Sequence, residues 1–204
     1  MAFDPCYRMP PWVPCMARVR GEVDEMEIRQ AQRDVRMVYV GGFAGALVSA
    51  ALWLSSAAAA TWGTASAAIY LLVVGGVAIF PLTQLALRVM GRPAALPRGH
   101  PMNGLAMQVA FVLPLTLPIV GAAALYRLEW FYPAFMIALG AHYLPFVFLY
   151  GMWQYAVLAG ALVLTGLALA LYVPGGFALG GWLTGALLLA FAFVGRSAAL
   201  HDGA

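Results

Sequence analysis

One histidine lies inside a long apolar stretch, and it is the residue of this sequence best suited to carrying a proton. The stretch is residues 130–151, WFYPAFMIALGAHYLPFVFLYG, in which His142 precedes Pro145 by three residues. Proline removes a helical hydrogen bond, so an ionisable side chain and a disrupted helix turn are expected together. An ionisable residue inside a membrane span marks a functional site by default. The alternative is a neutral histidine that joins helices through a hydrogen bond.

Three apolar stretches each combine a polar side chain with at least one proline. The polar residues are Gln84, Gln108 and His142, with Tyr143 beside it, and the prolines are Pro81, Pro114, Pro118 and Pro145. Broken helices expose backbone groups, and transporters use such breaks to bind solutes near the membrane midplane. The pattern predicts helix breaks at these prolines and a shared polar interior. Glutamine and proline also occur where membrane helices only pack together.

Recognisable catalytic and metal-binding motifs are absent from the sequence. It has no HExxH, GxSxG or GxxxxGK[ST] pattern, and His100, His142 and His201 are too dispersed for a metal site. It has no lysine, which excludes Schiff-base chemistry. We therefore predict no enzyme, no metal site and no cofactor.

A charged pair brackets a short turn, RLEW, between two apolar stretches. Arg127 and Glu129 flank the turn, and Trp130 and Tyr132 follow it. The two aromatic residues are typical of a membrane-interface belt. An exposed ion pair or simple anchoring is the expected role of the charges.

The composition is that of a membrane protein. Of the 204 residues, 64% are hydrophobic and 9% are charged, and the mean hydropathy is +0.87. A soluble domain carries about a quarter charged residues. The net charge of +3 is better explained by membrane topology than by a nucleic-acid partner. We predict an all-α, polytopic integral membrane protein whose partner is the lipid bilayer.

Six stretches are long enough to cross a membrane. They fall within a predicted transmembrane domain at residues 38–195, and they are 38–60, 67–89, 105–126, 130–151, 154–172 and 177–194. Short connections favour three consecutive hairpins. Residues 196–204 form a short polar tail.

The N-terminal region precedes these spans. Prolines at residues 1–21 predict a flexible tail without a stable helix. The tail lacks the apolar core of a signal peptide, and Met26 is an alternative start. Its two thiols, Cys6 and Cys15, are too far apart for a short zinc motif and are expected to be free.

Residues 22–37 predict a basic amphipathic helix. Arg29, Arg33 and Arg36 fall on one face, where they are expected to contact lipid headgroups. The alternative is a solvated helix that serves only as a topology signal.

Small residues recur at helical spacing in the first and last spans. Gly41, Gly45 and Ser49 form one row, and Gly181 and Gly185 belong to another. Such rows let helices approach closely, within a chain or between copies. They predict helix packing, with a homo-oligomer or a partner membrane protein as the structural consequence.

The arginines are distributed unequally between the loops. With six spans, both termini lie on one side, and that side holds every arginine except Arg127. The positive-inside rule then predicts cytoplasmic termini in a bacterial inner membrane.

Several segments resemble a known family. AQRDVRMVYVGGFAGALVSAALWL, IFPLTQLALRVMGR, HPMNGLAMQVAF and YPAFMIALGAHYLPFVFLYG are similar to a bacterial family of small multi-pass membrane proteins that is catalogued only as a domain of unknown function. The resemblance covers about residues 30–172 and is most specific at GAHYLPFVFLYG. It implies an integral membrane fold and no activity.

Three functions are compatible with these features. The first is a small transporter or channel-like subunit whose interior holds Gln84, Gln108 and His142. The alternative is a non-enzymatic structural or assembly protein that packs through its glycine faces. An intramembrane lipid enzyme has the least support, because a lone histidine supplies no nucleophile or metal.

Overall fold

The computed structural model describes residues 16–173 and 175–201, with side chains for 27–173 and 175–200, and the regular structure of this part is helical throughout. Six stretches in it are long and apolar enough to cross a membrane: Glu27–Trp62, Ala65–Val89, Asn103–Tyr126, Leu128–Tyr150, Gln154–Tyr172 and Leu179–Leu200. The predicted all-α, multi-pass class is confirmed.

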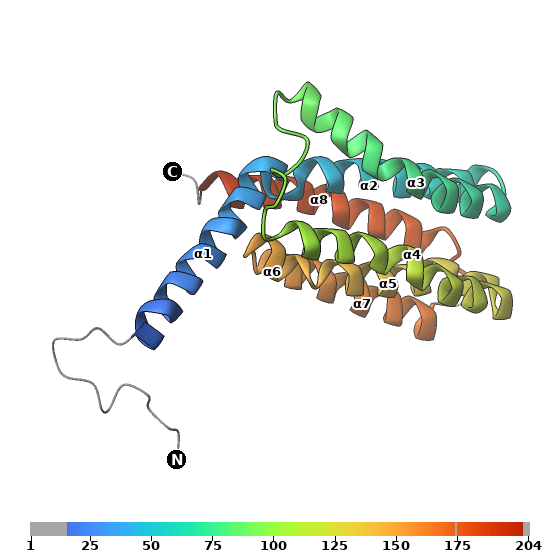
Figure 1. Ribbon diagram of the computed structural model, residues 1–204. Coiled ribbons are helices and arrows are strands. Elements are labelled where there is room, and N and C mark those ends of the chain that lie inside the picture. Colours follow the sequence, from blue (N-terminus) through green and yellow to red (C-terminus); the bar gives the residue numbers. More distant parts are fainter. Residues whose placement is uncertain (1–15, 174, 202–204) are drawn as a thin grey trace, which may run out of the picture.

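Ten helical elements follow one another along the described chain. They are α1 (Met16–Tyr39), η1 (Val40–Gly42), α2 (Phe43–Trp62), α3 (Ala65–Val89), α4 (Asn103–Tyr126), η2 (Leu128–Trp130), α5 (Phe131–Tyr143), α6 (Phe146–Tyr150), α7 (Gln154–Tyr172) and α8 (Leu179–His201). Helix α2 packs mainly against α8 and α3, and α5 packs mainly against α7 and α4 (Figure 1). The three-hairpin arrangement remains a prediction. In the third predicted hairpin, α7 packs mainly against α5 and α8 mainly against α2, and the two pack less against each other.

Several segments lie together at one end of the bundle, which we call the α1 end. They are helix α1, the end of α3, the loop at residues 90–102, the short helix α6 and the end of α8 (Figure 1). The turns at 63–64, 127–130 and 175–178 lie at the opposite end. Among the described side chains, every arginine except Arg127 belongs to an element of the α1 end.

Both terminal boundaries differ from the prediction. Helix α1 begins at Met16, within the predicted flexible tail, because no proline follows Pro14 there to stop it. Helix α8 continues to His201, through most of the predicted C-terminal tail. The predictions about Cys6 and Cys15 lie outside the described residues, and a surface position for α1 remains a prediction.

A tight turn interrupts the predicted first span. Val40, Gly41 and Gly42 have φ angles of 51°, 61° and 81°, which glycine adopts freely and valine rarely. A Cβ on Gly41 would also meet the carbonyl oxygen of Gly195 on α8. Gly41 therefore serves a turn packed against α8, and the membrane-crossing helix α2 begins only at Phe43.

Only one of the four prolines predicted to break helices separates two of them. Pro145 lies between α5 and α6, whereas α3 runs unbroken through Pro81 and α4 through Pro114 and Pro118. Membrane helices tolerate proline where nearby groups compensate for the lost bond. In α3 the C-terminal part leans away from α2 (Figure 1).

Candidate functional site

A set of polar side chains joins three segments at the α1 end, and we call it the polar junction: Gln32, Asp34, Arg36, His100 and Asn103. Its first half connects α1 to α6. The Gln32 side chain donates to the Phe148 carbonyl (2.7 Å), and the Arg36 guanidinium donates to the Tyr150 carbonyl (2.7 Å) and the Gly151 carbonyl (3.3 Å). The last carbonyls of a helix have no helical partner, so α1 caps the C-terminus of α6.

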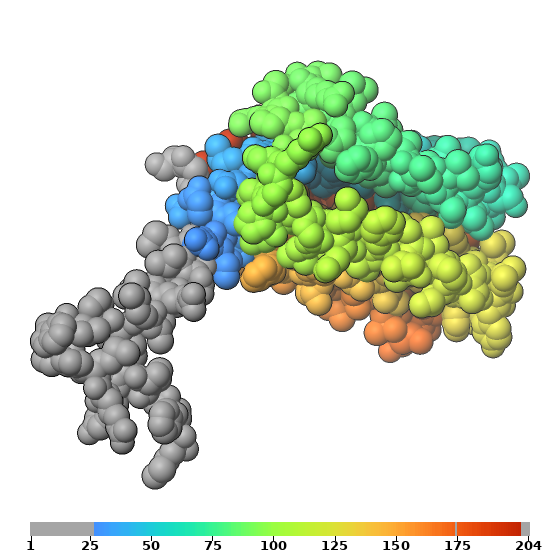
Figure 2. Space-filling view, viewed as in Figure 1, coloured from blue at the N-terminus to red at the C-terminus, as the bar shows by residue number. Residues whose placement is uncertain are grey.

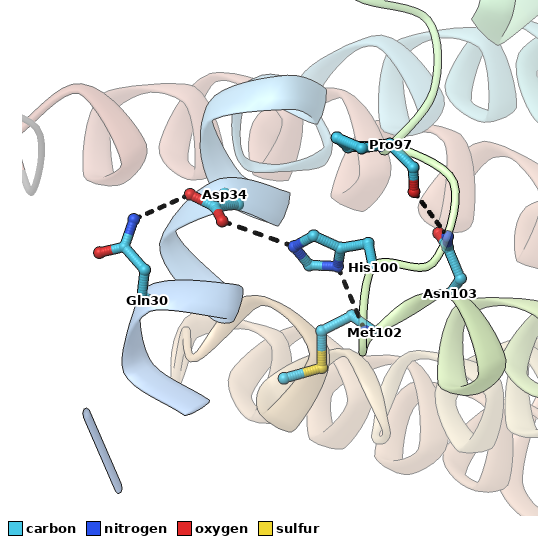
Figure 3. A network of polar contacts seen from close by, with 6 residues as sticks. All are labelled: Gln30, Asp34, Pro97, His100, Met102 and Asn103. Atoms are coloured by element: carbon cyan, nitrogen blue, oxygen red, sulfur yellow. Dashed lines mark hydrogen bonds and ion pairs between the residues drawn. The ribbon is translucent and has the colours of Figure 1, made fainter. Parts of the chain in front are cut away.

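The second half of the polar junction connects α1 to the loop before α4 (Figure 3). His100 Nε2 lies 3.5 Å from Asp34 Oδ2, and its Nδ1 accepts from the Met102 N–H (3.2 Å). Because Nδ1 is an acceptor, the neutral imidazole carries its hydrogen on Nε2, facing the carboxylate. At the start of α4, the Asn103 side chain donates to the Pro97 carbonyl of the loop (2.9 Å).

Most of the polar junction was not predicted from the sequence. Only Arg36 was predicted, as a lipid-facing residue, and its guanidinium instead contacts the α6 carbonyls. Arg29 and Arg33 are exposed, so lipid contact remains a prediction for those two. The signal available in the sequence was the apolar pair Ala31 and Val35, four residues apart. Both are buried, and because they place this face of α1 against the bundle, the polar side chains beside them also lie near it.

His142 lies in the last turn of α5, at the contact with α4. Its ring packs edge-on against Tyr143 and Phe146, with centroids 5.5 and 5.1 Å away. The backbone of Val109 on α4 lies near the ring, and the role of joining α5 to α4 remains the alternative. The Nδ1 atom is buried and has no hydrogen-bond partner.

Aromatic rings fill the space around the α5–α6 break. Phe146 and Tyr155 contact each other, and each of them also contacts Tyr143 and Tyr150, with ring centroids 5.1 to 6.0 Å apart. The Tyr155 hydroxyl donates to the Gly41 carbonyl (3.0 Å). This bond fixes the α1–α2 turn to α7.

Tyr143, predicted to line a polar interior, is buried in this aromatic cluster. Its side chain is only 7% exposed, so the residue belongs to the core of the bundle.

The two glutamines lie on different helices and differ in exposure. Gln84 is half-buried on α3, and Gln108 is exposed on α4. Next to Gln84, the Thr83 Oγ1 is buried and has no partner. Figure 2 shows a hollow in the surface between α3 and α4. The exposure of Gln108 does not fit a shared interior with His142.

The predicted packing glycines serve contacts within the chain. A Cβ on Gly181 would lie 2.9 Å from Ala57 Cβ, and one on Gly185 would lie 2.6 Å from the Leu54 side chain, both on α2. Gly45 has more room, since its nearest neighbour is Thr83 at 3.8 Å. The glycine row of α8 thus brings α8 close to α2.

Tyr132 is not part of an interface belt. It is fully buried, and its hydroxyl lies 2.6 Å from the Ser56 Oγ, which donates to the Ala68 carbonyl (2.9 Å). Since the serine hydrogen is used in that bond, the tyrosine hydroxyl is the donor to Ser56. This hydrogen-bond chain links α5, α2 and α3.

Comparison with known proteins identifies a family but no activity. A family model described as "Family of unknown function (DUF7010)" matches residues 28–196. The matched range contains the polar junction, His142 and the bundle. No curated protein and no solved structure matches the chain.

Proposed function

The chain belongs to the DUF7010 family, and because that family has no assigned activity, we propose a function from the geometry: a small transporter or channel-like subunit closed at the α1 end. The passing species would be a proton or a small cation that meets His142. The polar junction would hold the closed state, since α1 caps α6 directly after the helix break.

The unpartnered Nδ1 of His142 is the observation that carries this proposal. A buried polar atom without a hydrogen bond destabilises a fold by about 1–3 kcal/mol. A conducting state could supply water or an ion as the partner of this atom. The break at Pro145, three residues on, supports this view because a short helix such as α6 can move as a unit.

We test this with proteoliposomes that contain the purified chain and a pH-sensitive dye. His142→Phe keeps the ring volume and removes both nitrogens, so we expect proton or potassium-coupled flux to fall to the level of empty vesicles. Tyr172→Phe, at an exposed position of the opposite end, is the matched control and should retain full flux. Both variants should give the same yield of folded protein. Unchanged flux in His142→Phe, or no flux in the wild type, would contradict the proposal.

An assembly role is the second candidate, and the exposure of α3 and α4 favours it. Only 11% of the span window of each helix is buried within the chain, compared with 50% for Leu128–Tyr150. A Cβ on Gly76 of α3 or Gly121 of α4 would meet nothing within 4 Å. These helices are therefore available to a second copy, while the α8 glycines are occupied.

Native mass spectrometry in mild detergent tests the assembly role. We expect an oligomer that Gly121→Leu disrupts, because the added side chain prevents close helix approach. Gly104→Leu, at an exposed position of the first turn of α4 that is also open, is the control. A monomeric wild type would exclude self-assembly through this face.

A further inference from the structure

A cavity of about 260 Å³ opens at the end of the bundle opposite to α1. Its walls come from η2, the last turn of α7 and the segment before α8, and include Arg127, Glu129, Trp130, Leu169, Ala170 and Gly176. Small-molecule sites span roughly 300–1,000 Å³. The cavity is therefore suited to a group of a few heavy atoms.

Two opposite charges line this cavity, at a distance longer than that of a direct hydrogen bond. Arg127 Nη2 and Glu129 Oε2 are 3.7 Å apart, and their side chains are 50% and 43% exposed. Charge-assisted hydrogen bonds between such groups measure roughly 2.7–2.9 Å. Arg127 also lies over the Trp130 ring, 5.5 Å from its centroid. A cationic donor and an anionic acceptor are thus both available to a third group.

The last turn of α7 lines the same cavity as Glu129 and adds a carbonyl acceptor. The Leu169 carbonyl accepts from the Val173 N–H (3.2 Å). The Ala170 carbonyl would pair with the residue four positions on, but residue 174 is a proline and has no N–H. The C-terminus of a helix also favours positive charge. This side of the cavity therefore suits a cation that carries N–H donors.

Exposed aromatic side chains at the same end of the bundle indicate the level at which the cavity lies in a membrane. Trp62, Tyr126 and Tyr172 are 77%, 78% and 78% exposed at this end. Exposed tryptophan and tyrosine mark the headgroup level of a membrane. The cavity thus lies where lipid headgroups and solutes from the aqueous phase both have access.

We propose that this cavity binds an ethanolamine phosphate group, in which Arg127 contacts the phosphate while Glu129 and the Ala170 carbonyl accept hydrogen bonds from the primary ammonium. A choline group has no N–H donor, so it cannot make the second set of contacts. The group can belong to a phospholipid headgroup or to free phosphoethanolamine, and the experiment distinguishes the two.

Native mass spectrometry of the full chain, purified with an equal mixture of phosphatidylethanolamine and phosphatidylcholine, tests the site. The wild type should retain the ethanolamine lipid about tenfold more than the choline lipid, as expected for a hydrogen bond to a charged group. Glu129→Gln should abolish that preference, whereas Arg127→Gln should lower the retention of both lipids, because both carry the phosphate. Ala170→Leu should also lower the retention of both lipids by filling the cavity, whereas Ala168→Leu, an exposed alanine of α7 that is not among the lining residues, should not.

Free phosphoethanolamine added to the same sample separates the two sources. If free phosphoethanolamine displaces the retained lipid, the site recognises the headgroup alone. If the lipid stays bound and only the variants remove it, the site is specific for the lipid form. Equal retention of both lipids by the wild type would overturn the proposal. An unchanged preference in Glu129→Gln would also overturn it, provided that thermal unfolding shows this variant to be as well folded as the wild type.

Discussion

At the scale of single residues, the hydrogen-bond chain of Tyr132, Ser56 and the Ala68 carbonyl offers the sharpest test of the structure. Ser56→Ala leaves the fully buried tyrosine hydroxyl without its acceptor. We expect the free energy of unfolding to fall by about 1–3 kcal/mol, the cost of an unsatisfied buried polar group. Thermal unfolding of the detergent-solubilised protein measures the effect.

The neighbouring serine is a matched control for this substitution. Ser55 is exposed, and its hydroxyl donates only to the Ala51 carbonyl of its own helix (2.8 Å). Ser55→Ala should therefore leave the melting temperature nearly unchanged. In the double variant Ser56→Ala with Tyr132→Phe, part of the lost stability should return, because the unsatisfied hydroxyl is gone. Equal effects of the two serine variants would contradict the structure at this point.

Single residues also show what a sequence can and cannot reveal. His142 stands out because its type is rare in an apolar span, and the break at Pro145 follows from proline chemistry. The buried position of Tyr132 could not be predicted, because tyrosine suits both a membrane interface and a hydrogen-bonded core. The turn at Val40 was hidden for a related reason, since valine gives no signal for a positive φ.

At the scale of elements, the capping of α6 by α1 leads to a second prediction. Arg36→Ala removes the donors to the Tyr150 and Gly151 carbonyls, and hydrogen bonds to charged groups contribute about 1.5–3 kcal/mol. We expect amide hydrogen exchange at residues 147–152 to become at least about tenfold faster. Arg33→Ala, an exposed position on the same helix, should leave it unchanged. Slow exchange in both variants would show that α6 does not depend on α1.

The extents of the elements were predictable, and their partners were not. Hydropathy located all six spans, because a membrane-crossing segment needs apolar side chains toward lipid and a helix that pairs its own backbone groups. The pairing of α5 with α7 depends on close fits such as that of Gly166, where a Cβ would lie 2.8 Å from the Pro133 carbonyl oxygen. Lipid covers an apolar face as well as another helix does, so hydropathy carries no information about which faces meet.

At the scale of the whole molecule, the charge distribution between the two ends leads to a prediction of orientation. The α1 end holds the described arginines at positions 29, 33, 36, 88, 92, 98 and 196, and the opposite end holds only Arg127. Positive side chains near span ends are retained in the cytoplasm during insertion. We therefore expect the α1 end, with both termini, to face the cytoplasm. This orientation would place the polar junction inside the cell and the cavity at Arg127 outside it.

Reporter fusions measure this orientation directly. Green fluorescent protein fused after Ala204 should fluoresce, because it folds in the cytoplasm, and alkaline phosphatase at the same position should be inactive. A phosphatase inserted at Leu128 should show the opposite result. Moving positive charge to the other end, with Arg88, Arg92 and Arg98 changed to glutamine and arginines added beside Arg127, should produce a mixed population, because the orientation depends on the difference between the two ends. Phosphatase activity after Ala204 in the unmodified chain would reverse the assignment of both ends.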